Sequence, residues 1–309
     1  MLQIKVKILY NKRIKGNYFH LVLRAPKITK ESLPGQFLMV QESIKHFPIP
    51  LRKSLKVIAD HAYGGSRQRR EGDFLDIKVN DAYEPLLRRP FSIHRVKGAN
   101  MELLYEVVGQ ATEILSHRKP GEYLDVIGPL GNGFSYQSQV TRPTPKRGYP
   151  ESQILVAGGM GIAPLLFLAE KLVSNPQTTA HRPPLVLIGA KKKNIIACEE
   201  EFKKIGCEVK TATDDGSRGF KGKVTDLLKN ILRVTSYELR VTIYACGPKP
   251  MLKEISWISK KYNIPAQVSL EEHMACGIGV CLGCVVNTKE GFKRVCKEGP
   301  VFNGDEIIW

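Results

Sequence analysis

The sequence of 309 residues predicts two packed domains and a small C-terminal appendage, an antiparallel β domain followed by a doubly wound α/β domain. Three observations support this fold class. Short β-like runs fill the first part of the chain, a strand–helix–strand rhythm begins at Gln153, and four closely spaced cysteines mark a tail that lacks this rhythm. We therefore expect domains at residues 1–150, 151–270 and 271–309.

The first domain is predicted from short alternating runs separated by turns, up to about Phe134. These runs are Gln3–Leu9, Tyr18–Leu23, Gln36–Val40, Phe91–Val96, Met101–Val108 and Tyr123–Ile127. Their length and spacing are typical of an antiparallel barrel or sandwich. The stretch Val140–Pro150, rich in Pro, Thr, Arg and Gly, then predicts an exposed linker or loop.

The second domain is predicted from alternating strands and helices. Expected strands are Ile154–Ala157, Leu185–Gly189, Glu208–Ala212, Val241–Ala245 and Gln267–Leu270, with the clearest helices at Pro164–Val173 and Pro250–Tyr262. This alternation is the signature of a parallel, doubly wound sheet.

Two strand ends in this domain carry candidate site residues. The first strand runs into Gly159-x-Gly161-x-x-Pro164, where glycines permit a tight turn and a pyrophosphate can approach helix N-terminal amides. The pattern is not the full dinucleotide fingerprint, and such a turn is often only a strand–helix corner. A later strand ends in Cys246-Gly247-Pro248, at the sheet edge where open α/β folds bind ligands.

The cysteines Cys276, Cys281, Cys284 and Cys296 have the spacing C-x4-C-x2-C-x11-C. The first three match the plant-type 2Fe–2S ligand run, which needs a fourth thiolate from further along the chain. The alternatives are a zinc site, which usually has two short cysteine clips, and free or bridged thiols. The other cysteines, Cys198, Cys207 and Cys246, show no ligand spacing.

The first domain contains Arg88-Arg89-Pro90-Phe91-Ser92 at the start of a strand. An arginine that pairs with a phosphate, an aromatic ring that packs on a flat cofactor and a hydroxyl that hydrogen bonds to it would suit a flavin. A solvated strand edge is the simpler interpretation of the two arginines.

The composition contains 47 Lys and Arg against 30 Asp and Glu, a formal net charge of +17. This charge favours an acidic partner surface or an anionic ligand such as a dinucleotide. We expect no nucleic-acid partner, because the basic residues are scattered and no recognition motif appears. We expect no membrane partner and a cytoplasmic location, because neither a signal peptide nor a transmembrane stretch is apparent.

Together these regions resemble a known family. The order Arg-Pro-Phe-Ser, Gly-Gly-x-Gly-x-x-Pro and Cys-Gly-Pro is similar to the ferredoxin–NADP reductase superfamily of flavin oxidoreductases. More closely, the chain resembles the electron-transfer subunits of the NAD-linked dihydroorotate dehydrogenases. The segments that carry this closer resemblance are Leu86–Pro90, Gly128–Phe134, Ser269–Gly279 and Cys296–Phe302.

The resemblance implies an FAD-binding barrel, an NAD-binding domain and a 2Fe–2S module held by the four cysteines. FAD would contact Arg89, Pro90, Phe91, Ser92, Tyr105, Glu106, Val107, Ala111 and Thr112. The nicotinamide cofactor would lie between Gly159–Pro164 and Cys246–Pro248, with Asp214–Gly216 nearby. The cluster would face an FMN-containing catalytic subunit in a heterotetramer. Electrons from dihydroorotate, oxidised there in pyrimidine biosynthesis, would pass through the cluster to FAD and then to NAD.

Three features depart from the family pattern. Residues 43–83 lengthen the region before the flavin motif and carry two basic groups, which predict a partner-docking hairpin or a solvated loop. His273 and Glu106 stand where arginine is expected. Lys191–Lys193 follow a strand at a place suited to the 2′-phosphate of NADPH or to a solvated helix start. We expect NADH, because Glu199–Glu201 of a helix predicted at Asn194–Lys204 would neutralise lysines and repel that phosphate.

Two other functions share parts of this pattern. An NAD(P)H:ferredoxin or sulfide-type oxidoreductase subunit would carry the same cofactors and serve a different partner. A protein without redox function would hold structural zinc, and it would lack the visible absorption of flavin and 2Fe–2S.

Overall fold

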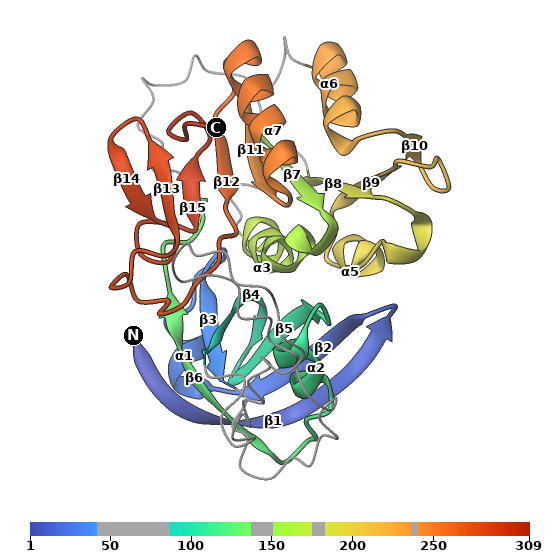
Figure 1. Cartoon of the computed structure of the whole chain (residues 1–309). Coiled ribbons are helices and arrows are strands. Elements are labelled where there is room, and N and C mark those ends of the chain that lie inside the picture. The colour runs from blue at the N-terminus through green and yellow to red at the C-terminus, as the bar shows by residue number, and fades with distance from the viewer. Residues whose placement is uncertain (42–86, 137–150, 175–182, 236–239) are drawn as a thin grey trace, which may run out of the picture.

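The computed structural model describes residues 1–41, 87–136, 151–174, 183–235 and 240–309. The predicted basic groups within residues 43–83 and the predicted linker Val140–Pro150 lie outside the described residues. Figure 1 shows a barrel below an α/β sheet, with the C-terminal segment alongside both. In the part of the chain that is described, no helix is long and apolar enough to cross a membrane.

The first domain is a closed antiparallel barrel, which decides between the two predicted β architectures. Its order is β1-β2-β5-β4-β3-β6. The strands are β1 (Leu2–Lys15), β2 (Tyr18–Arg24), β3 (Phe37–Gln41), β4 (Arg89–Lys97), β5 (Asn100–Glu106) and β6 (Tyr123–Leu130), with short helices α1 (Pro26–Thr29) and α2 (Gln110–Ser116). In β1, Val6 and Ile8 are buried while Lys5 and Lys7 are exposed, as the period of two requires. All six β-runs predicted from the sequence appear as strands.

The second domain contains a seven-stranded sheet with the order β10-β9-β8-β7-β11-β12-β15. Its strands are β7 (Glu151–Gly158), β8 (Leu185–Ala190), β9 (Glu208–Thr213), β10 (Phe220–Lys221), β11 (Arg240–Cys246), β12 (Ala266–Ser269) and β15 (Val301–Asn303). Neighbouring strands are parallel except that β15 runs antiparallel to β12. The five strands predicted for this domain are confirmed.

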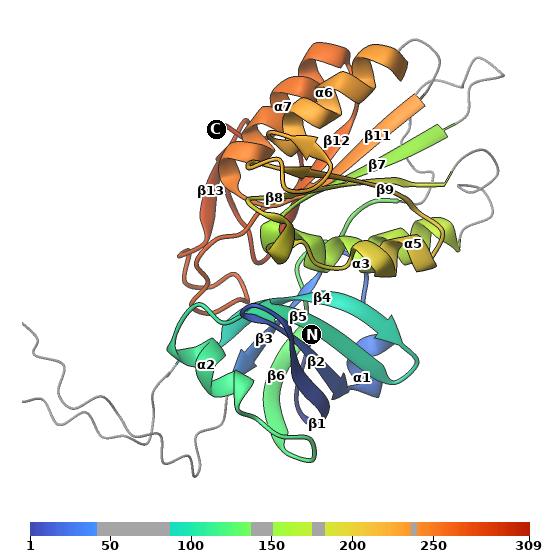
Figure 2. The same ribbon diagram turned by 90° about the vertical axis from the view of Figure 1, so that its right-hand side faces the viewer.

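Helices cover both faces of this sheet (Figure 2). The helices α3 (Ile162–Val173) and α5 (Glu199–Lys204) lie on the face toward the barrel, and α6 (Val224–Thr235) and α7 (Lys249–Tyr262) lie on the other. Every residue of α3 from Ile162 to Ala169 is buried, because this helix lies between the sheet and β4. Its nearly continuous apolar sequence follows from burial on two sides.

The helix predicted at Asn194–Lys204 is wrong in its first half. A single 3₁₀ turn, η2 (Lys193–Ile195), is followed by extended chain at Ile196 and by a left-handed residue, Cys198, with φ 59°. The side chains of Ile196–Cys198 turn inward and pack in the core formed with α3. The ammonium group of Lys15 also holds the carbonyl oxygens of Lys193 and Ile196, at 3.2 and 3.1 Å.

The C-terminal tail has more regular structure than the sequence predicted. It contains a hairpin, β13 (Val285–Thr288) and β14 (Gly291–Arg294), and the strand β15, which completes the large sheet. Cys284, Cys296 and Phe302 share one buried core with strands of the sheet and with Met39 of the barrel. The tail is therefore packed against both earlier parts of the chain.

Candidate functional site

The two arginines before β4 have different environments. The guanidinium of Arg88 forms an ion pair with Asp125 at 3.0 Å and donates to its carbonyl oxygen. The guanidinium of Arg89 instead donates to the carbonyl oxygens of Leu87 and Arg88, and it pairs with no carboxylate among the described residues. Arg89 is therefore the arginine with charge available for a phosphate.

The aromatic ring of the predicted flavin motif does not lie on the barrel surface. Phe91 is 7% exposed, and its ring packs edge-on against Tyr105 with centroids 5.8 Å apart. Both rings belong to the barrel core. The alternation of β4 leaves Pro90 and Ser92 on the partly exposed side, so these two side chains are more accessible to a cofactor than the Phe91 ring is.

The remaining predicted flavin residues lie where β5 ends and α2 begins. Glu106 pairs in register with Tyr18, whose hydroxyl pKa is raised by burial and then by the charge of Glu106. Val107 follows directly. Ala111 is buried in the first turn of α2, and the hydroxyl of Thr112 accepts from two backbone N–H groups just before that helix. Because β5 pairs with β4, Glu106 and the Arg-Pro-Phe-Ser strand lie in neighbouring barrel strands, and Ala111 and Thr112 lie in the helix that follows β5.

The glycine turn and the Cys-Gly-Pro strand end, between which the nicotinamide is expected, are in direct contact. Gly159 has φ +54° with open space beside it, whereas a Cβ on Gly161 would lie 2.1 Å from the carbonyl oxygen of Cys246. Gly247, with φ +155°, packs on the backbone of Gly158. Pro164 is buried in the first turn of α3. A backbone turn that is open on one side and packed tightly on the other fits a pyrophosphate.

Cys246 is 1% exposed at the end of β11. Burial, followed by the nearby charge of Glu271, raises the pKa of its thiol well above the ordinary value. The thiol is therefore neutral at physiological pH. It lies at the carboxyl edge of the sheet, opposite Ala157 and Ser269 in the neighbouring strands.

Two of the three acidic residues expected to neutralise Lys191–Lys193, Glu199 and Glu200, pair elsewhere. Glu199 accepts from both Arg218 and Lys203, at 2.7 and 2.8 Å, and Glu200 accepts from Lys203 at 3.0 Å. The reason given for excluding a 2′-phosphate is therefore wrong for these glutamates. Asp215, with its pKa lowered chiefly by hydrogen bonds from Ser217, lies beyond the end of β9 and interacts electrostatically with Lys192. A carboxylate at this place can accept from a ribose 2′-hydroxyl and repel a phosphate.

The four predicted ligand cysteines come together as two pairs. The backbone N–H of Cys281 lies 3.5 Å from the Cys276 sulfur, and that of Cys296 lies 3.4 Å from the Cys284 sulfur. Cys284 and Cys296 are buried, whereas Cys281 is exposed. Among the described residues, no group of three or more His, Cys, Asp or Glu side chains could hold a metal ion as the chain stands. Two thiols for each of two irons is the ligand arrangement of a 2Fe–2S cluster.

The two ends of the ligand set differ in how their surroundings shift the thiol pKa. Burial opposes the charge of Cys276, but backbone N–H groups of Cys281, Ile278 and Val280 lower its pKa to about 6. Burial and the adjacent Cys284 thiol raise the pKa of Cys296 to about 12, because two neighbouring thiolates repel in the absence of a cation. The donor set therefore fits a cationic iron centre.

One pair of barrel strands connects the three predicted sites. A Cβ on Gly277, in the cysteine loop, would lie 2.3 Å from the side chain of Met39, and Met39 pairs with Pro90 across β3 and β4. Four residues further along β4, the buried ring of His94 donates from Nδ1 to the carbonyl oxygen of Ala163 in α3, at 2.8 Å. The flavin motif therefore lies between the cysteine loop and the helix that follows the glycine turn.

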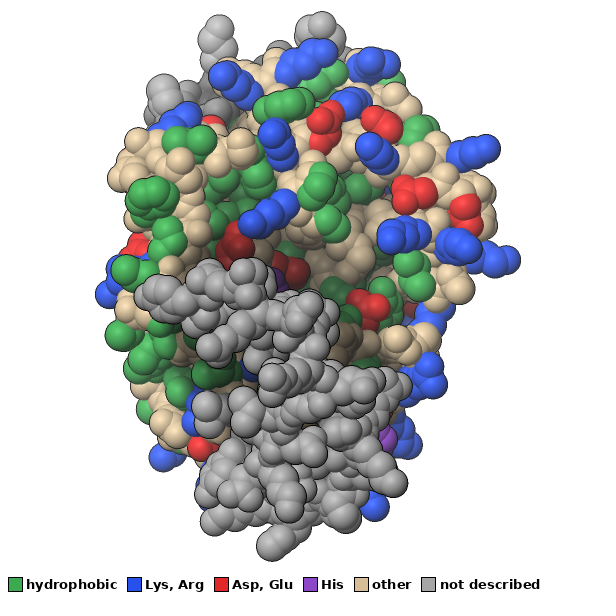
Figure 3. Space-filling view, in the orientation of Figure 1, with side chains coloured by type: hydrophobic (Ala, Val, Ile, Leu, Met, Phe, Trp, Pro, Cys, Tyr) green, Lys and Arg blue, Asp and Glu red, His purple; other side chains and the backbone are tan. Residues whose placement is uncertain are grey.

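The open face of the molecule is hollowed between the barrel and the sheet (Figure 3). Where grey atoms do not cover it, acidic side chains line the hollow and many Lys and Arg side chains lie toward the outer edge.

Sequence reasoning missed three residues whose hydrogen bonds join separate parts of this region. His94 connects β4 to Ala163, Asn132 connects the end of β6 to Glu298, and Arg294 connects β14 to Gly279 of the cysteine loop. His94 gave no signal, because a lone histidine in a strand is ordinary. Asn132 lay within a segment that carried only the family resemblance. Arg294 and Glu298 lie four residues apart around Cys296, and opposite charges on both sides of a ligand were a usable signal.

Comparison with known proteins places these observations in a family. Residues 271–308 match the model of the iron-sulfur cluster binding domain of dihydroorotate dehydrogenase B, and residues 155–256 match the oxidoreductase NAD-binding domain. The chain is 33% identical over 311 residues to the dihydroorotate dehydrogenase B (NAD(+)) electron transfer subunit of Caldanaerobacter subterraneus subsp. tengcongensis, with 99% of both chains covered. The subunit of the same name from Desulforamulus reducens is 42% identical over 247 residues, which cover 77% of this chain and 86% of that one.

Solved structures share the fold. The NADH-dependent reduced ferredoxin-NADP oxidoreductase has a TM-score of 0.70 and 26% identity, with 98% of this chain and 90% of that chain covered. A ferredoxin NADP+ reductase from Neisseria gonorrhoeae has a TM-score of 0.56 and 15% identity, covering 84% and 91%.

These matches confirm the predicted fold class and the assignment as an oxidoreductase that transfers electrons. The two family models also bear out the predicted iron–sulfur cluster and NAD(H). The electron-transfer role implies a catalytic partner subunit. The chain belongs to the family of dihydroorotate dehydrogenase B (NAD(+)) electron transfer subunits.

Proposed function

We propose that this chain passes electrons between a nicotinamide dinucleotide and an FMN-containing catalytic subunit that oxidises dihydroorotate, within a heterotetramer. The three domains at residues 1–150, 151–270 and 271–309 would bind FAD, NAD(H) and the 2Fe–2S cluster, respectively. FAD, when bound, exchanges a hydride with nicotinamide and single electrons with the cluster. We place this activity in the cytoplasm, which suits a chain whose seven cysteines are all free thiols.

The observation that carries this proposal is the position of β3 and β4 between the other two sites. Gly277 of the cysteine loop packs on Met39 of β3, and His94 of β4 hydrogen bonds to Ala163 beside the glycine turn. A flavin along the Arg89–Ser92 strand would therefore lie between the cluster and the nicotinamide. This is the order that electron transfer between them requires.

Within the flavin site, we assign the cofactor phosphate to Arg89, and the isoalloxazine contacts to the exposed side of Pro90 and Ser92 and to the backbone of Phe91. Glu106, Val107, Ala111 and Thr112 would border the ribityl and pyrophosphate groups, and Tyr105 would support β4 from the core. In the dinucleotide site, Gly159, Gly161 and Pro164 would form the phosphate turn, and Cys246, Gly247 and Pro248 would border the nicotinamide.

The exposed surface of the cysteine loop supports docking of the catalytic subunit there. Val280 and Leu282 flank the ligand Cys281 and are 74% and 60% exposed, and Phe292 on the adjacent hairpin is 79% exposed. Apolar side chains concentrated at a redox centre suit an interface that excludes water and brings a second cofactor close.

Co-purification with the partner tests this function. The chain should carry FAD and a 2Fe–2S cluster, and FMN should appear in the preparation only together with a second subunit. Dihydroorotate-dependent reduction of NAD should need both subunits. Stable cofactor loading without an FMN-containing partner, and without this activity in a reconstituted complex, would contradict the proposal.

Surface variants locate the docking face. Replacing Val280 and Leu282 together by aspartate should abolish partner binding while leaving the FAD and iron content unchanged. The matched control is Val234→Asp on α6, where the side chain is 85% exposed on another element. Equal loss of partner binding in both variants would remove the cysteine loop from the interface.

A second function is favoured by one specific observation. The match to the NADH-dependent reduced ferredoxin-NADP oxidoreductase covers 98% of this chain at a TM-score of 0.70, so a closely similar fold serves an enzyme named for ferredoxin. Reduction of a ferredoxin by NADH or NADPH, without any dihydroorotate-dependent activity in the presence of the FMN subunit, would select this second function.

A further inference from the structure

Arg294, the last residue of β14, connects two parts of the cysteine site. Its Nη1 donates to the carbonyl oxygen of Gly279 at 2.7 Å, and its Nε donates to the Glu298 carboxylate at 3.0 Å. The other terminal nitrogen also donates to that carboxylate, so the pair is bidentate. A planar guanidinium held on one side by a carboxylate has a fixed orientation on the other side.

Gly279 lies between two of the ligand thiols, Cys276 and Cys281. It has φ +82°, and a Cβ there would lie 2.7 Å from the side chain of Lys297. The loop that carries the first two thiols therefore rests directly on the segment that follows the fourth, Cys296. The hydrogen bond from Arg294 holds this contact closed across 15 residues of sequence.

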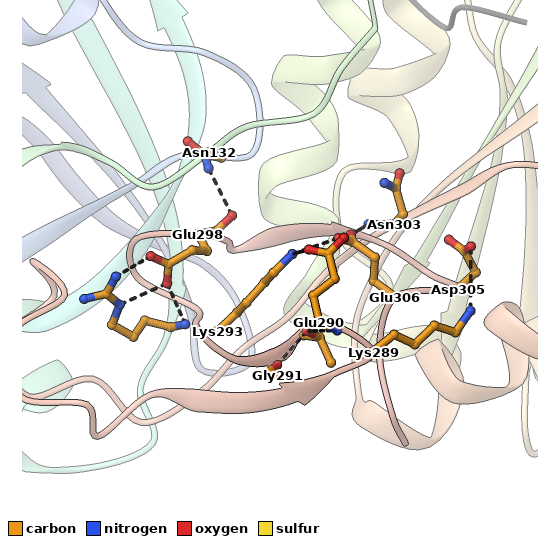
Figure 4. Close-up of polar contacts among 11 residues, drawn as sticks. Asn132, Lys289, Glu290, Gly291, Lys293, Glu298, Asn303, Asp305 and Glu306 are labelled. Atoms are coloured by element: carbon orange, nitrogen blue, oxygen red, sulfur yellow. Dashed lines mark hydrogen bonds and ion pairs between the residues drawn. The ribbon is translucent and has the colours of Figure 1, made fainter.

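Glu298 connects the same segment to the barrel. Its carboxylate also accepts from the backbone N–H of Arg294 at 2.7 Å, and its carbonyl oxygen accepts from the Asn132 side chain at 3.0 Å. The backbone N–H of Asn132 donates to the carbonyl oxygen of Gly299 at 2.6 Å. Figure 4 shows Glu298 with its carbonyl oxygen toward Asn132 and its carboxylate turned to the opposite side.

We infer that Arg294, oriented by Glu298, is a positioning residue that closes the Cys276–Cys281 loop onto the Cys296 segment and sets the charge beside the cluster. This inference rests on the proposed function for the presence of the cluster. Cys284 and Cys296 lie within electrostatic range of the guanidinium. A positive charge there stabilises the reduced, more negative cluster and raises its reduction potential, while the Glu298 carboxylate partly cancels this effect.

Two variants separate the effect of the Arg294–Gly279 hydrogen bond, here called the clamp, from the effect of the Arg294 charge. Arg294→Gln should accelerate iron loss to a ferrous chelator by about 10- to 100-fold, the usual effect of removing a group that orients metal ligands. It should also lower the midpoint potential in an EPR-monitored redox titration. Glu298→Gln should accelerate iron loss less, because an amide oxygen still accepts from Arg294, and it should raise the potential.

Two further variants complete the test. Arg294→Lys keeps the positive charge but lacks the planar guanidinium that donates to Gly279 and Glu298 at the same time. The midpoint potential of the cluster should therefore stay near that of the wild type, while iron loss should be as fast as in Arg294→Gln. Lys289→Gln removes a charge from the same hairpin, 65% exposed and outside the clamp, and should change neither quantity. Potential shifts of the same sign in Arg294→Gln and Glu298→Gln, or wild-type iron retention in both, would overturn the inference.

Hydrogen exchange of the iron-free chain tests, independently of the cluster, whether Arg294 holds the cysteine loop in place. Amides of residues 277–283 should exchange faster in Arg294→Gln than in the wild type, and no faster in Lys289→Gln. Unchanged exchange in Arg294→Gln would overturn the clamp. Absence of a cluster from the wild-type chain would instead contradict the proposed function.

Discussion

Replacing His94 with asparagine should reduce the loss of stability of this chain as the pH falls from 7 to 5. His94 is 4% exposed between the barrel and α3, where Nδ1 donates to the carbonyl oxygen of Ala163. Its pKa is lowered from 6.5 to about 4, chiefly by burial; the charges of Arg95 and His20 also lower it, whereas the hydrogen bond to Ala163 and the charge of Glu102 oppose the shift. The asparagine amide of the variant can still donate to Ala163 but does not titrate.

The sign and size of the effect follow from linkage. Because the folded-state pKa lies below that of the unfolded chain, the stability contributed by neutral His94 is complete above pH 6.5 and is lost as the pH falls toward 4. Each unit of pKa shift corresponds to about 1.4 kcal/mol, so neutral His94 contributes about 3 kcal/mol to the free energy of unfolding at neutral pH. About 2 kcal/mol of this contribution is lost between pH 7 and pH 5.

Urea unfolding at pH 7 and pH 5, followed by tryptophan fluorescence, measures this term. The free energy of unfolding is the urea midpoint multiplied by the slope of its dependence on urea concentration. Between pH 7 and pH 5, this free energy should fall by about 2 kcal/mol more in the wild type than in His94→Asn. His117→Asn on α2 is the control, since this histidine is 57% exposed and should leave the wild-type pH dependence intact. Equal pH dependence in the wild type and His94→Asn would refute the reasoning.

Three further predictions concern the cofactors. Cys284→Ser should remove the visible signature of the cluster and electron delivery to the partner, but leave flavin reduction by NADH intact; Cys198→Ser should change neither, and wild-type iron content in the Cys284 variant would contradict the ligand assignment. Arg89→Ala should weaken FAD binding by about 1.5–3 kcal/mol in equilibrium dialysis. Arg88→Ala, which breaks an ion pair and a backbone hydrogen bond to Asp125, should not; equal affinities would remove Arg89 from the site. Flavin reduction should have a higher kcat/KM with NADH than with NADPH, and replacing Lys191–Lys193 by alanine should hardly affect NADH; the reverse preference would assign those lysines to a 2′-phosphate.

Hydrophobic periodicity predicted most of the architecture because burial is one-sided in the barrel strands and two-sided in the central sheet. The alternation of buried and exposed residues in β1 reflects burial on one side, and the apolar run of α3 reflects burial on two sides. The strand β15 could not be predicted in the same way. Only three residues long, it pairs because the C-terminal segment returns beside β12, and no local pattern encodes that return.

The candidate site divides along the same line. Cysteine spacing identified the ligands because the chemistry constrains the sequence directly, and the glycine turn was recognisable because only small residues permit the contact between Gly161 and Cys246. The position of the Phe91 ring depended on strand register, which the motif alone does not specify. The ion-pair partners of Glu199 depended on where Arg218 returns in space, 19 residues along the chain.

The attachment of the cysteine segment at both ends bears on how electrons cross this molecule. At its start, the backbone N–H of Leu270 donates to the carbonyl oxygen of Pro300 at 2.8 Å, and β12 pairs with β15. Also near its start, Gly277 packs on Met39, and toward its end the side chain and backbone N–H of Asn132 donate to the carbonyl oxygens of Glu298 and Gly299. A cysteine segment joined by a single linker could rotate away from β4, which carries the Arg-Pro-Phe-Ser motif. A segment fixed to both the sheet and the barrel keeps a constant distance from both. Under the proposed function, these attachments would fix the separation of flavin and cluster, and docking would bring the partner's cofactor to the exposed Cys281 side.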